Sequence, residues 1–231
     1  MGIRWSGTPD RRCGPWRDNL AGVDEADFAA LPRGRHNLTR DQVESAQRGR
    51  LLYGMAMSVA EKGYVATSVA DVLKRVHISR DTFYQHFSDK EDCFLAALDG
   101  CAALLSNLVE GPLIDGDGDP LERFDQALVL YLDTLVAQSA LAKMFFLESF
   151  AAGERARRTR FAVLAEFGSR MADALADHPG WAGVPDREFA VGMISSAISS
   201  MVAAALAEGR VDELPALREP IMAFVRYVLT P

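Results

Sequence analysis

The spacing of hydrophobic residues along this chain predicts helices throughout. From residue 39 onward, apolar side chains recur three or four positions apart, as they do on one face of a helix. Runs of alternating apolar and polar residues, which are typical of half-buried strands, do not occur in the sequence. We therefore expect an all-α fold of about nine helices.

The first long helix is predicted to begin after Thr39 and to end at Gly63. Thr39 and Gln42 have the spacing of a capping box, in which each side chain accepts a hydrogen bond from the other residue's backbone N–H. Gly63 can adopt the backbone conformation that ends a helix. The expected buried face carries Leu51, Leu52, Met55, Ala56 and Val59.

Two short helices joined by a tight turn are predicted next. Thr67 or Ser68 caps the first of them, and Ser79 caps the second. Phe83 and Phe87 should face inward, with Ile78 filling the space between the two helices. A further capping box is expected at 88–91, where the following helix would begin.

The rest of the chain has the same helical pattern. Helices are expected at 88–110, 121–135, 140–151, 154–177, 186–208 and 215–229, with loops at 111–120 and 179–185.

The charge of the chain is unevenly distributed. The net charge of the 231 residues is −7, which by itself argues against a nucleic-acid-binding protein. Residues 32–92, however, contain 10 Lys and Arg against 8 Asp and Glu, whereas residues 93–231 contain 11 against 19. Because DNA binding depends on local patches, this division favours a DNA-facing N-terminal part.

Cysteines and hydropathy indicate a cytoplasmic protein. Cys13, Cys93 and Cys101 give no disulfide framework, and the last two are expected to be small buried side chains. No signal peptide is expected at the N-terminus. The longest uncharged run, 189–207, contains four serines and a glycine, so a buried helix explains it better than a membrane span.

The second short helix presents a polar side that suits DNA. If Phe83 and Phe87 face inward, the side chains left outside are Ser79, Arg80, Thr82, Tyr84, Gln85 and His86. Arg can pair with guanine and Gln with adenine in the major groove. Tyr84, His86 and Lys90 suit phosphates, and the N-terminus of the preceding helix, at Thr67 and Ser68, offers N–H groups to another phosphate.

Residues 45–98 resemble the DNA-binding domain of the TetR/AcrR family of transcriptional regulators. The matching segments are AEKGYVATSVADV at 60–72 and SRDTFYQHFSDKEDCF at 79–94. The resemblance implies a three-helix helix-turn-helix domain at 39–91 and a helical ligand-binding and dimerisation domain at 92–231. A flexible arm is expected at 1–38.

The resemblance also implies roles for individual residues. Thr67, Tyr84, His86 and Lys90 would contact phosphates, whereas Arg80, Asp81, Thr82 and Gln85 would lie over base edges. Position 81 is commonly small in the family, so Asp81 is a departure. Its carboxylate could accept a hydrogen bond from cytosine, but we expect it to pair with Arg80 or Arg75.

A short basic segment precedes the first long helix. Arg33 and Arg35 flank a glycine there. Arginines in such an arm can enter a narrow minor groove. The alternative is a solvated linker.

Two sets of residues are candidates for a dimer interface. Small residues recur every fourth position at Gly192, Ser196, Ser200 and Ala204, and larger apolar residues follow at Leu217, Ile221, Phe224 and Val228. The resemblance implies a four-helix dimer interface from these two helices. Packing within one chain is the alternative.

An excess of aromatic residues and methionine favours a ligand cavity. The candidates are Tyr131, Met144, Phe145, Phe146, Phe150, Phe161, Phe167 and Met171. Dense core packing would explain most of them individually. The arginines at 155, 157, 158 and 160 are expected on a solvated face, although they could also meet an anionic ligand group such as an acyl-CoA phosphate.

Enzymatic and metal sites are not expected. The acidic residues 115, 117 and 119 lack the glycine and the final glutamate of a calcium loop, and the histidines have no ligand spacing. We therefore expect a cytoplasmic homodimer without a cofactor that binds a palindromic operator. A repressor released by an apolar or aromatic ligand is favoured over an activator, a ligand-independent DNA-binding protein, and a small-molecule-binding protein that has lost DNA binding.

Overall fold

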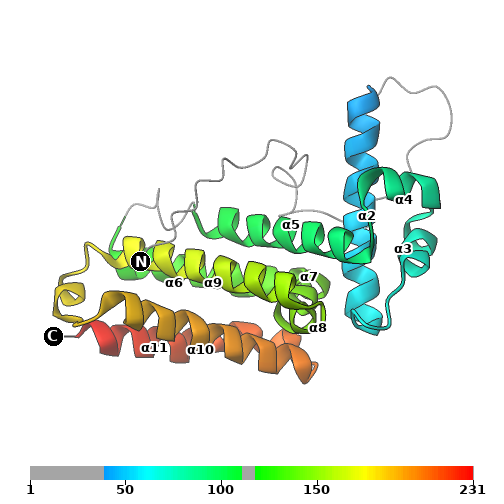
Figure 1. Ribbon diagram of the computed structural model, residues 1–231. Coiled ribbons are helices and arrows are strands. Elements are labelled where there is room, and N and C mark those ends of the chain that lie inside the picture. Colours follow the sequence, from blue (N-terminus) through cyan, green and yellow to red (C-terminus); the bar gives the residue numbers. More distant parts are fainter. Residues whose placement is uncertain (1–38, 111–117, 231) are drawn as a thin grey trace.

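The computed structural model describes residues 39–110 and 118–230. Within these ranges every regular element is a helix, so the expected all-α fold is confirmed. The N-terminal arm with Arg33, Arg35 and Cys13, and the acidic residues 115 and 117, lie outside the described residues. Figure 1 shows a small lobe, built around α2 with α3 and α4 beside it, and a larger lobe of long helices.

The small lobe consists of α2 (Arg40–Lys62), α3 (Val69–Val76), α4 (Arg80–His86) and the first part of α5 (Lys90–Glu110). Leu51, Met55 and Phe83 have no solvent exposure and form its core. Gly54 allows α3 to approach α2 closely, because a Cβ atom at this position would lie 2.5 Å from a Val76 methyl carbon. The close packing of α2 and α3 therefore depends on the absence of a side chain at residue 54.

Side-chain caps define the helix boundaries in the small lobe. Thr39 and Gln42 form the predicted capping box, and Ser68 forms a second one with Asp71. The box predicted at 88–91 is wrong by one residue. Instead, the Asp89 carboxylate accepts from the Asp92 N–H at 2.8 Å, and Asp92 accepts from the Ser88 N–H at 2.8 Å.

Five long helices run alongside one another in the larger lobe (Figure 1). They are α5, α6 (Pro120–Ala137), α9 (Glu154–Leu175), α10 (Arg187–Ala207) and α11 (Arg218–Leu229). α9 lies against α5, α6 and α10, so it forms the middle of the bundle. α5 belongs to both lobes, since it also packs against α2.

The segment predicted as one helix at 140–151 contains a wider turn. It comprises α7 (Ser139–Lys143), the π-helix η4 (Met144–Glu148) and α8 (Ser149–Ala151). Met144, Phe145 and Phe146 of η4 are all buried. A π turn is uncommon and is often found at functional sites.

Two further boundaries differ from the sequence prediction. The loop predicted at 179–185 contains a 3₁₀ helix, η5 (Pro179–Gly183), held by the buried Trp181. The last helix was expected from residue 215, but Val211–Leu217 is the 3₁₀ helix η6 and α11 begins at Arg218. Pro215 lies inside η6, and its missing N–H disfavours a regular α-helix there.

Candidate nucleic-acid interface and ligand cavity

Helix α4 is held from its inner side and exposed on its outer side. Phe83 and Phe87 are almost fully buried, with their ring centroids 5.7 Å apart, as predicted. Arg80, Asp81, Tyr84 and Gln85 are exposed, whereas Thr82 and His86 are half-buried. The helix therefore presents a polar edge whose position is determined by two phenylalanines.

The N-terminus of α4 is capped by Ser79. Its hydroxyl accepts from the Thr82 N–H at 3.1 Å and contacts the Thr82 hydroxyl at 2.9 Å. These bonds orient the first turn, from which Arg80 and Asp81 project.

Asp81 does not have the partner predicted for it. Arg75 instead pairs with Glu61 and donates to the Ser58 hydroxyl at 3.2 Å. Neither Asp81 nor Arg80 forms an ion pair with another residue in the described part of the chain. The carboxylate of Asp81 is therefore exposed on the outer edge of α4, next to the arginine expected to read bases.

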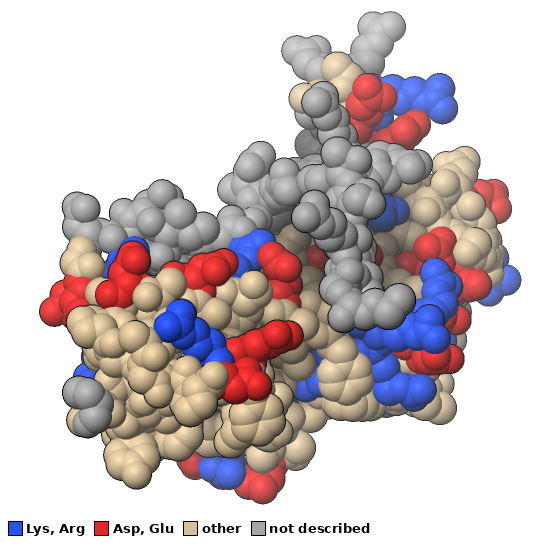
Figure 2. Space-filling view, turned by 60° about the vertical axis from the view of Figure 1, so that its left-hand side comes forward, with Lys and Arg blue, Asp and Glu red and all other residues tan. Residues whose placement is uncertain are grey.

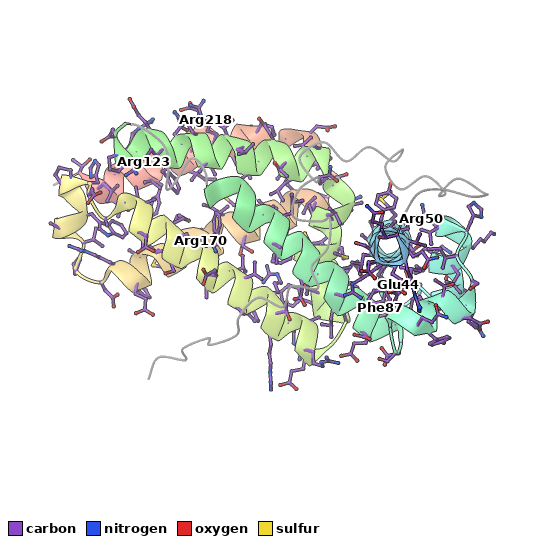
Figure 3. All side chains as sticks on the ribbon, turned by 90° about the horizontal axis from the view of Figure 1, so that it is seen from above. Glu44, Arg50, Phe87, Arg123, Arg170 and Arg218 are labelled. Carbon is purple, nitrogen blue, oxygen red and sulfur yellow. The ribbon has the colours of Figure 1, made fainter. Side chains whose placement is uncertain are left out.

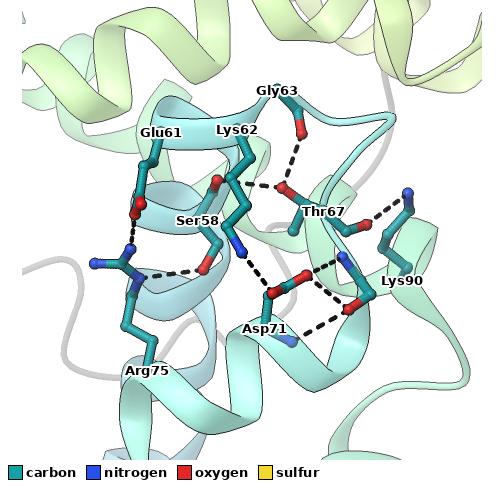
Figure 4. A network of polar contacts seen from close by, with 9 residues as sticks. Ser58, Glu61, Lys62, Gly63, Thr67, Asp71, Arg75 and Lys90 are labelled. Atoms are coloured by element: carbon teal, nitrogen blue, oxygen red, sulfur yellow. Dashed lines mark hydrogen bonds and ion pairs between the residues drawn. The ribbon is translucent and has the colours of Figure 1, made fainter.

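Thr67 and Lys90 make internal contacts in place of the free phosphate-binding groups that were expected (Figure 4). The buried Thr67 hydroxyl donates toward the carbonyls of Gly63 and Ser58, at 2.8 and 3.2 Å. The Lys90 ammonium donates to the carbonyls of Tyr64 and Thr67, at 2.9 and 3.0 Å, and lies 4.1 Å from the centroid of the Tyr64 ring. Both side chains therefore hold the segment between α2 and α3 in place.

The N-terminus of α3 is exposed to solvent at Ser68. Ser68 caps it, with its backbone N–H and hydroxyl both directed to Asp71. Lys62 lies 2.6 Å from the same carboxylate, and its hydrogen bond, with those from Ser68, holds the pKa of Asp71 well below its ordinary value. Asp71 therefore remains ionised as a fixed cap of α3.

Two arginines on α2 stabilise its neighbours, and Figure 3 labels one of them, Arg50, together with Phe87. The buried Arg50 donates to the Val76 carbonyl at the end of α3. The guanidinium carbon of Arg48 lies 4.6 Å from the centroid of the Phe87 ring. Burial, together with the Arg48 charge, lowers the pKa of His86 below its ordinary value.

The charge distribution agrees with a DNA-facing small lobe. Figure 2 shows Lys and Arg grouped around the small lobe, mixed with Asp and Glu, and acidic side chains along one edge of the larger lobe. This arrangement matches the division of charge along the sequence.

The predicted ligand residues divide into buried and exposed groups. Tyr131, Met144, Phe145, Phe146 and Met171 are buried, and Phe167 is half-buried. Phe150 and Phe161, however, are 47% and 56% exposed, with their ring centroids 6.5 Å apart. They line neither of the two small apolar cavities beside Tyr131 and form an aromatic pair at the surface.

Two small apolar cavities lie on either side of a stacked ring pair. Tyr131 and Phe167 stack with their centroids 5.4 Å apart, and both rings line each cavity. One cavity, of about 10 Å³, also contacts Phe124 and Met171, and the other, of about 20 Å³, also contacts Phe145 and Phe146. Each has room for about one water molecule. A larger ligand would have to displace the ring pair that divides them.

The arginine cluster at the start of α9 is not uniformly solvated. Arg155, Arg157 and Arg158 are exposed, as predicted, but Arg160 is buried, with 5% exposure. The sequence analysis did not predict the burial of Arg160, because helical periodicity alone does not show which of the four arginines faces inward.

The small-residue stripe of α10 faces outward. Gly192, Ser196, Ser200 and Ala204 are all exposed, together with Phe189, Met193 and Met201, which the sequence analysis did not include. On α11, Phe224 and Tyr227 are exposed, but Ile221 is buried within the protomer. Leu217 lies in η6 and packs against the core. Leu217 and Ile221 therefore stabilise the chain itself.

α10 and α11 together form an apolar groove. It has a volume of about 250 Å³ and includes Phe189, Met193, Phe224 and Val228. By length and composition α10 could also cross a membrane, with a mean hydropathy of 1.8, and 44% of its most apolar window is buried. Helix α6 and the segment Ser139–Ala151, bent by 96° to each other, also meet this criterion of length and composition when taken together. The core helix of a soluble protein meets the same criterion.

Glu148 connects the two lobes, and sequence reasoning missed it. Its carboxylate accepts from the Tyr64 backbone N–H at 2.7 Å, although the two residues are 84 positions apart. Glu148 ends η4, whose Phe145 and Phe146 line one of the cavities. A second connection joins Arg155 to Glu91, at 3.6 Å.

The arrangement of α2, α3 and α4 beside a larger helical bundle is that of a helix-turn-helix domain joined to a second helical lobe. Residues 55–97 match the sequence profile of "Bacterial regulatory proteins, tetR family". The transcriptional regulator AcuR of Cereibacter sphaeroides is 30% identical over 88 residues, which are 38% of this chain and 37% of that protein. The transcriptional activator FasR of Mycolicibacterium smegmatis is 29% identical over 93 residues, 40% of this chain and 41% of FasR.

Solved structures are similar over most of the chain. The fatty acid degradation regulator FadR of Bacillus halodurans has a TM-score of 0.70 at 19% identity, covering 79% of this chain and 94% of FadR. The Bacillus subtilis FadR in complex with stearoyl-CoA has a TM-score of 0.65 at 18% identity, covering 76% and 95%. These likenesses establish the fold of both lobes.

In its DNA-binding segment, over residues 55–97, the chain therefore resembles the TetR family of transcriptional regulators. The relatives and solved structures named above are regulators, which agrees with the expectation that this chain is not an enzyme. The chain spans less than half of the length of the curated relatives that it matches.

Proposed function

We propose that this protein is a sequence-specific DNA-binding regulator in which Arg80 and Gln85 read bases. The observation that carries this proposal is the exposed polar edge of α4, held in place by the buried Phe83 and Phe87. Tyr84 and the open N-terminus of α3 at Ser68 would contact phosphates. Asp81 and Thr82 would lie over neighbouring base edges, where an unpaired Asp81 accepts from a cytosine amine.

The regulator acts as a homodimer on a palindromic operator. A two-fold DNA site requires a two-fold protein, with its recognition helices about 34–36 Å apart. The exposed apolar residues of α10 and α11, including Phe189, Met193 and Phe224, supply a surface that a second copy would cover. Gly192 and Ser196 allow close helix approach there.

A small apolar or aromatic ligand would release the repressor from its operator. The aromatic cavities beside Tyr131 and Phe167 support this response, as does the similarity to a FadR structure that contains stearoyl-CoA. One relative carries the name of an activator, so activation is the second candidate function. We place the protein in the cytoplasm and the domain boundary near residue 91, within α5.

The test of the DNA-reading proposal is a binding-site selection from random duplex DNA, followed by affinity measurements. Arg80→Ala and Gln85→Ala should each lose about 1–3 kcal/mol of discrimination at one base position. Tyr84→Phe should weaken binding to every sequence alike, because only a phosphate contact is removed.

Failure to select any palindromic sequence would refute the regulator. Equal weakening of all sequences by Arg80→Ala and Gln85→Ala would refute the division between base and phosphate contacts.

A further inference from the structure

Arg160 is a buried cation without a counter-charge. It is 5% exposed, and no carboxylate pairs with it in the part of the chain that the structure describes. Its Nη2 donates to the Ser199 hydroxyl at 2.7 Å, and its buried Nε has no hydrogen-bond partner. An unpaired buried charge is costly, so such a residue requires an explanation.

Aromatic rings surround this guanidinium. Its central carbon lies 4.8 Å from the ring centroid of Phe150, 5.7 Å from that of Phe161 and 5.9 Å from that of Phe146. Cation–π contacts offset part of the burial cost, but they leave the Nε–H donor unused. Burial accordingly lowers the pKa of Arg160, although an arginine stays protonated at neutral pH.

Arg160 lies between the surface and the small apolar cavity beside Tyr131 and Phe167. On one side, Phe150 and Phe161 are half exposed and cover it from solvent. On the other side, Phe146 lines the cavity that also contacts Tyr131 and Phe167. The positive charge of Arg160 also partly opposes the rise in the pKa of Tyr131 that burial causes. A molecule entering between the exposed rings would therefore meet the guanidinium before the apolar cavity.

We propose that Arg160 anchors the carboxylate of an amphiphilic ligand whose apolar part occupies the cavity beside Tyr131, Phe146 and Phe167. This inference rests on the proposed ligand response and specifies its chemistry. A planar carboxylate matches the guanidinium fork, and its one negative charge balances the one buried positive charge. A phosphate would bring a second charge, while Arg155, Arg157 and Arg158 are all exposed.

Binding would link the ligand to two elements. The apolar part would move the rings of η4, and η4 ends at Glu148, which holds Tyr64 of the small lobe. The carboxylate would replace or share the hydrogen bond from Arg160 to Ser199 of α10, the helix whose opposite side is exposed.

The test measures binding of straight-chain carboxylates with four to twelve carbons and of the matching primary alcohols to the full-length protein. Titration calorimetry should show at least one carboxylate binding about tenfold more tightly than its alcohol, as expected for a charge-assisted bond. Arg160→Met should reduce this preference to within about threefold. Arg157→Met, which removes an exposed arginine of the same helix, should leave it unchanged.

Stability measurements separate this role from a structural one. Without ligand, Arg160→Met should unfold at the same or a higher temperature than the natural protein, because a buried unpaired charge is replaced by an apolar side chain. Ser199→Ala should keep the carboxylate preference, because it removes only the internal acceptor and leaves the Arg160 guanidinium in place. A marked loss of unfolding temperature in Arg160→Met would assign Arg160 to structure and overturn the proposal.

Two outcomes of the titration would also overturn the proposal. In the first, no carboxylate binds more tightly than its matching alcohol. In the second, Arg160→Met still binds the carboxylate about tenfold more tightly than the alcohol. Operator binding is measured separately by gel shift. If the protein binds an operator but shows no carboxylate preference, the proposed anchor is refuted and the proposed regulator function stands. If it prefers carboxylates but binds no operator, only the proposed regulator function is refuted.

Discussion

Single residues in the small lobe have positions that their side-chain chemistry alone would not predict. Lys90 and Thr67 are the types of residue that contact phosphates, yet the carbonyls of Tyr64, Gly63 and Ser58 are their partners. Asp81 shows the opposite, since it was expected to be paired and is exposed without an ion pair among the described residues. The role of each of these side chains depends on its partners in the tertiary structure, and helical periodicity does not identify those partners.

Gly54 is the residue at which a single methyl group should matter most in the small lobe. Gly54→Ala should lower the free energy of unfolding by about 1–3 kcal/mol, because the added carbon would overlap Val76 of α3. Helix propensity alone would predict a gain of about 1 kcal/mol. Chemical denaturation gives the difference.

Gly183→Ala is the control for Gly54→Ala. Gly183 is the last residue of η5, and a Cβ atom there would meet no other atom within 4 Å. The control should therefore leave the free energy of unfolding close to that of the natural protein. Equal effects of the two substitutions on unfolding would contradict the close packing of α2 and α3.

At the scale of elements, η4 is the segment that joins the apolar cavity beside Tyr131 and Phe167 to the small lobe. Its buried rings line the cavity, and its last residue accepts a hydrogen bond from the end of α2. Sequence patterns predicted a helix here but not the π turn, since the hydrophobic residues Met144, Phe145 and Phe146 are consecutive. Packing of all three into one core requires the wider turn.

Glu148→Ala should loosen the attachment of the small lobe. Loss of this charge-assisted bond should cost about 1–3 kcal/mol locally, so the Tyr64 amide should exchange its hydrogen at least about fivefold faster. Hydrogen-exchange mass spectrometry measures this rate in the peptide that contains the end of α2.

Glu154→Ala provides the comparison, since Glu154 forms an exposed pair with Arg158 of the same helix. It should leave exchange at Tyr64 unaltered. Unchanged exchange in Glu148→Ala would mean that the two lobes are held together without this bond.

At the scale of the whole molecule, the exposed apolar face of α10 and α11 should be the dimer interface. Phe224→Asp would place a charge in this face and should convert a dimer into a monomer, because burying an unpaired carboxylate is costly. Analytical ultracentrifugation of Phe224→Asp should show half the mass of the natural dimer. A gel-shift assay should show a large loss of operator affinity. Val65→Asp, at a 79% exposed position of the small lobe, should remain dimeric. If Phe224→Asp remains a dimer, the interface lies outside this face of α10 and α11.

The sequence by itself determined the all-α fold, the start and end of α2, α3 and α4, and the polar edge of the recognition helix. These follow from local physics, because capping residues and the spacing of Phe83 and Phe87 act within a few positions. Only the tertiary structure decided which residues are partners. It buried Arg160 among exposed arginines, turned Ile221 into the protomer and brought Glu148 to Tyr64, since these depend on how distant helices pack.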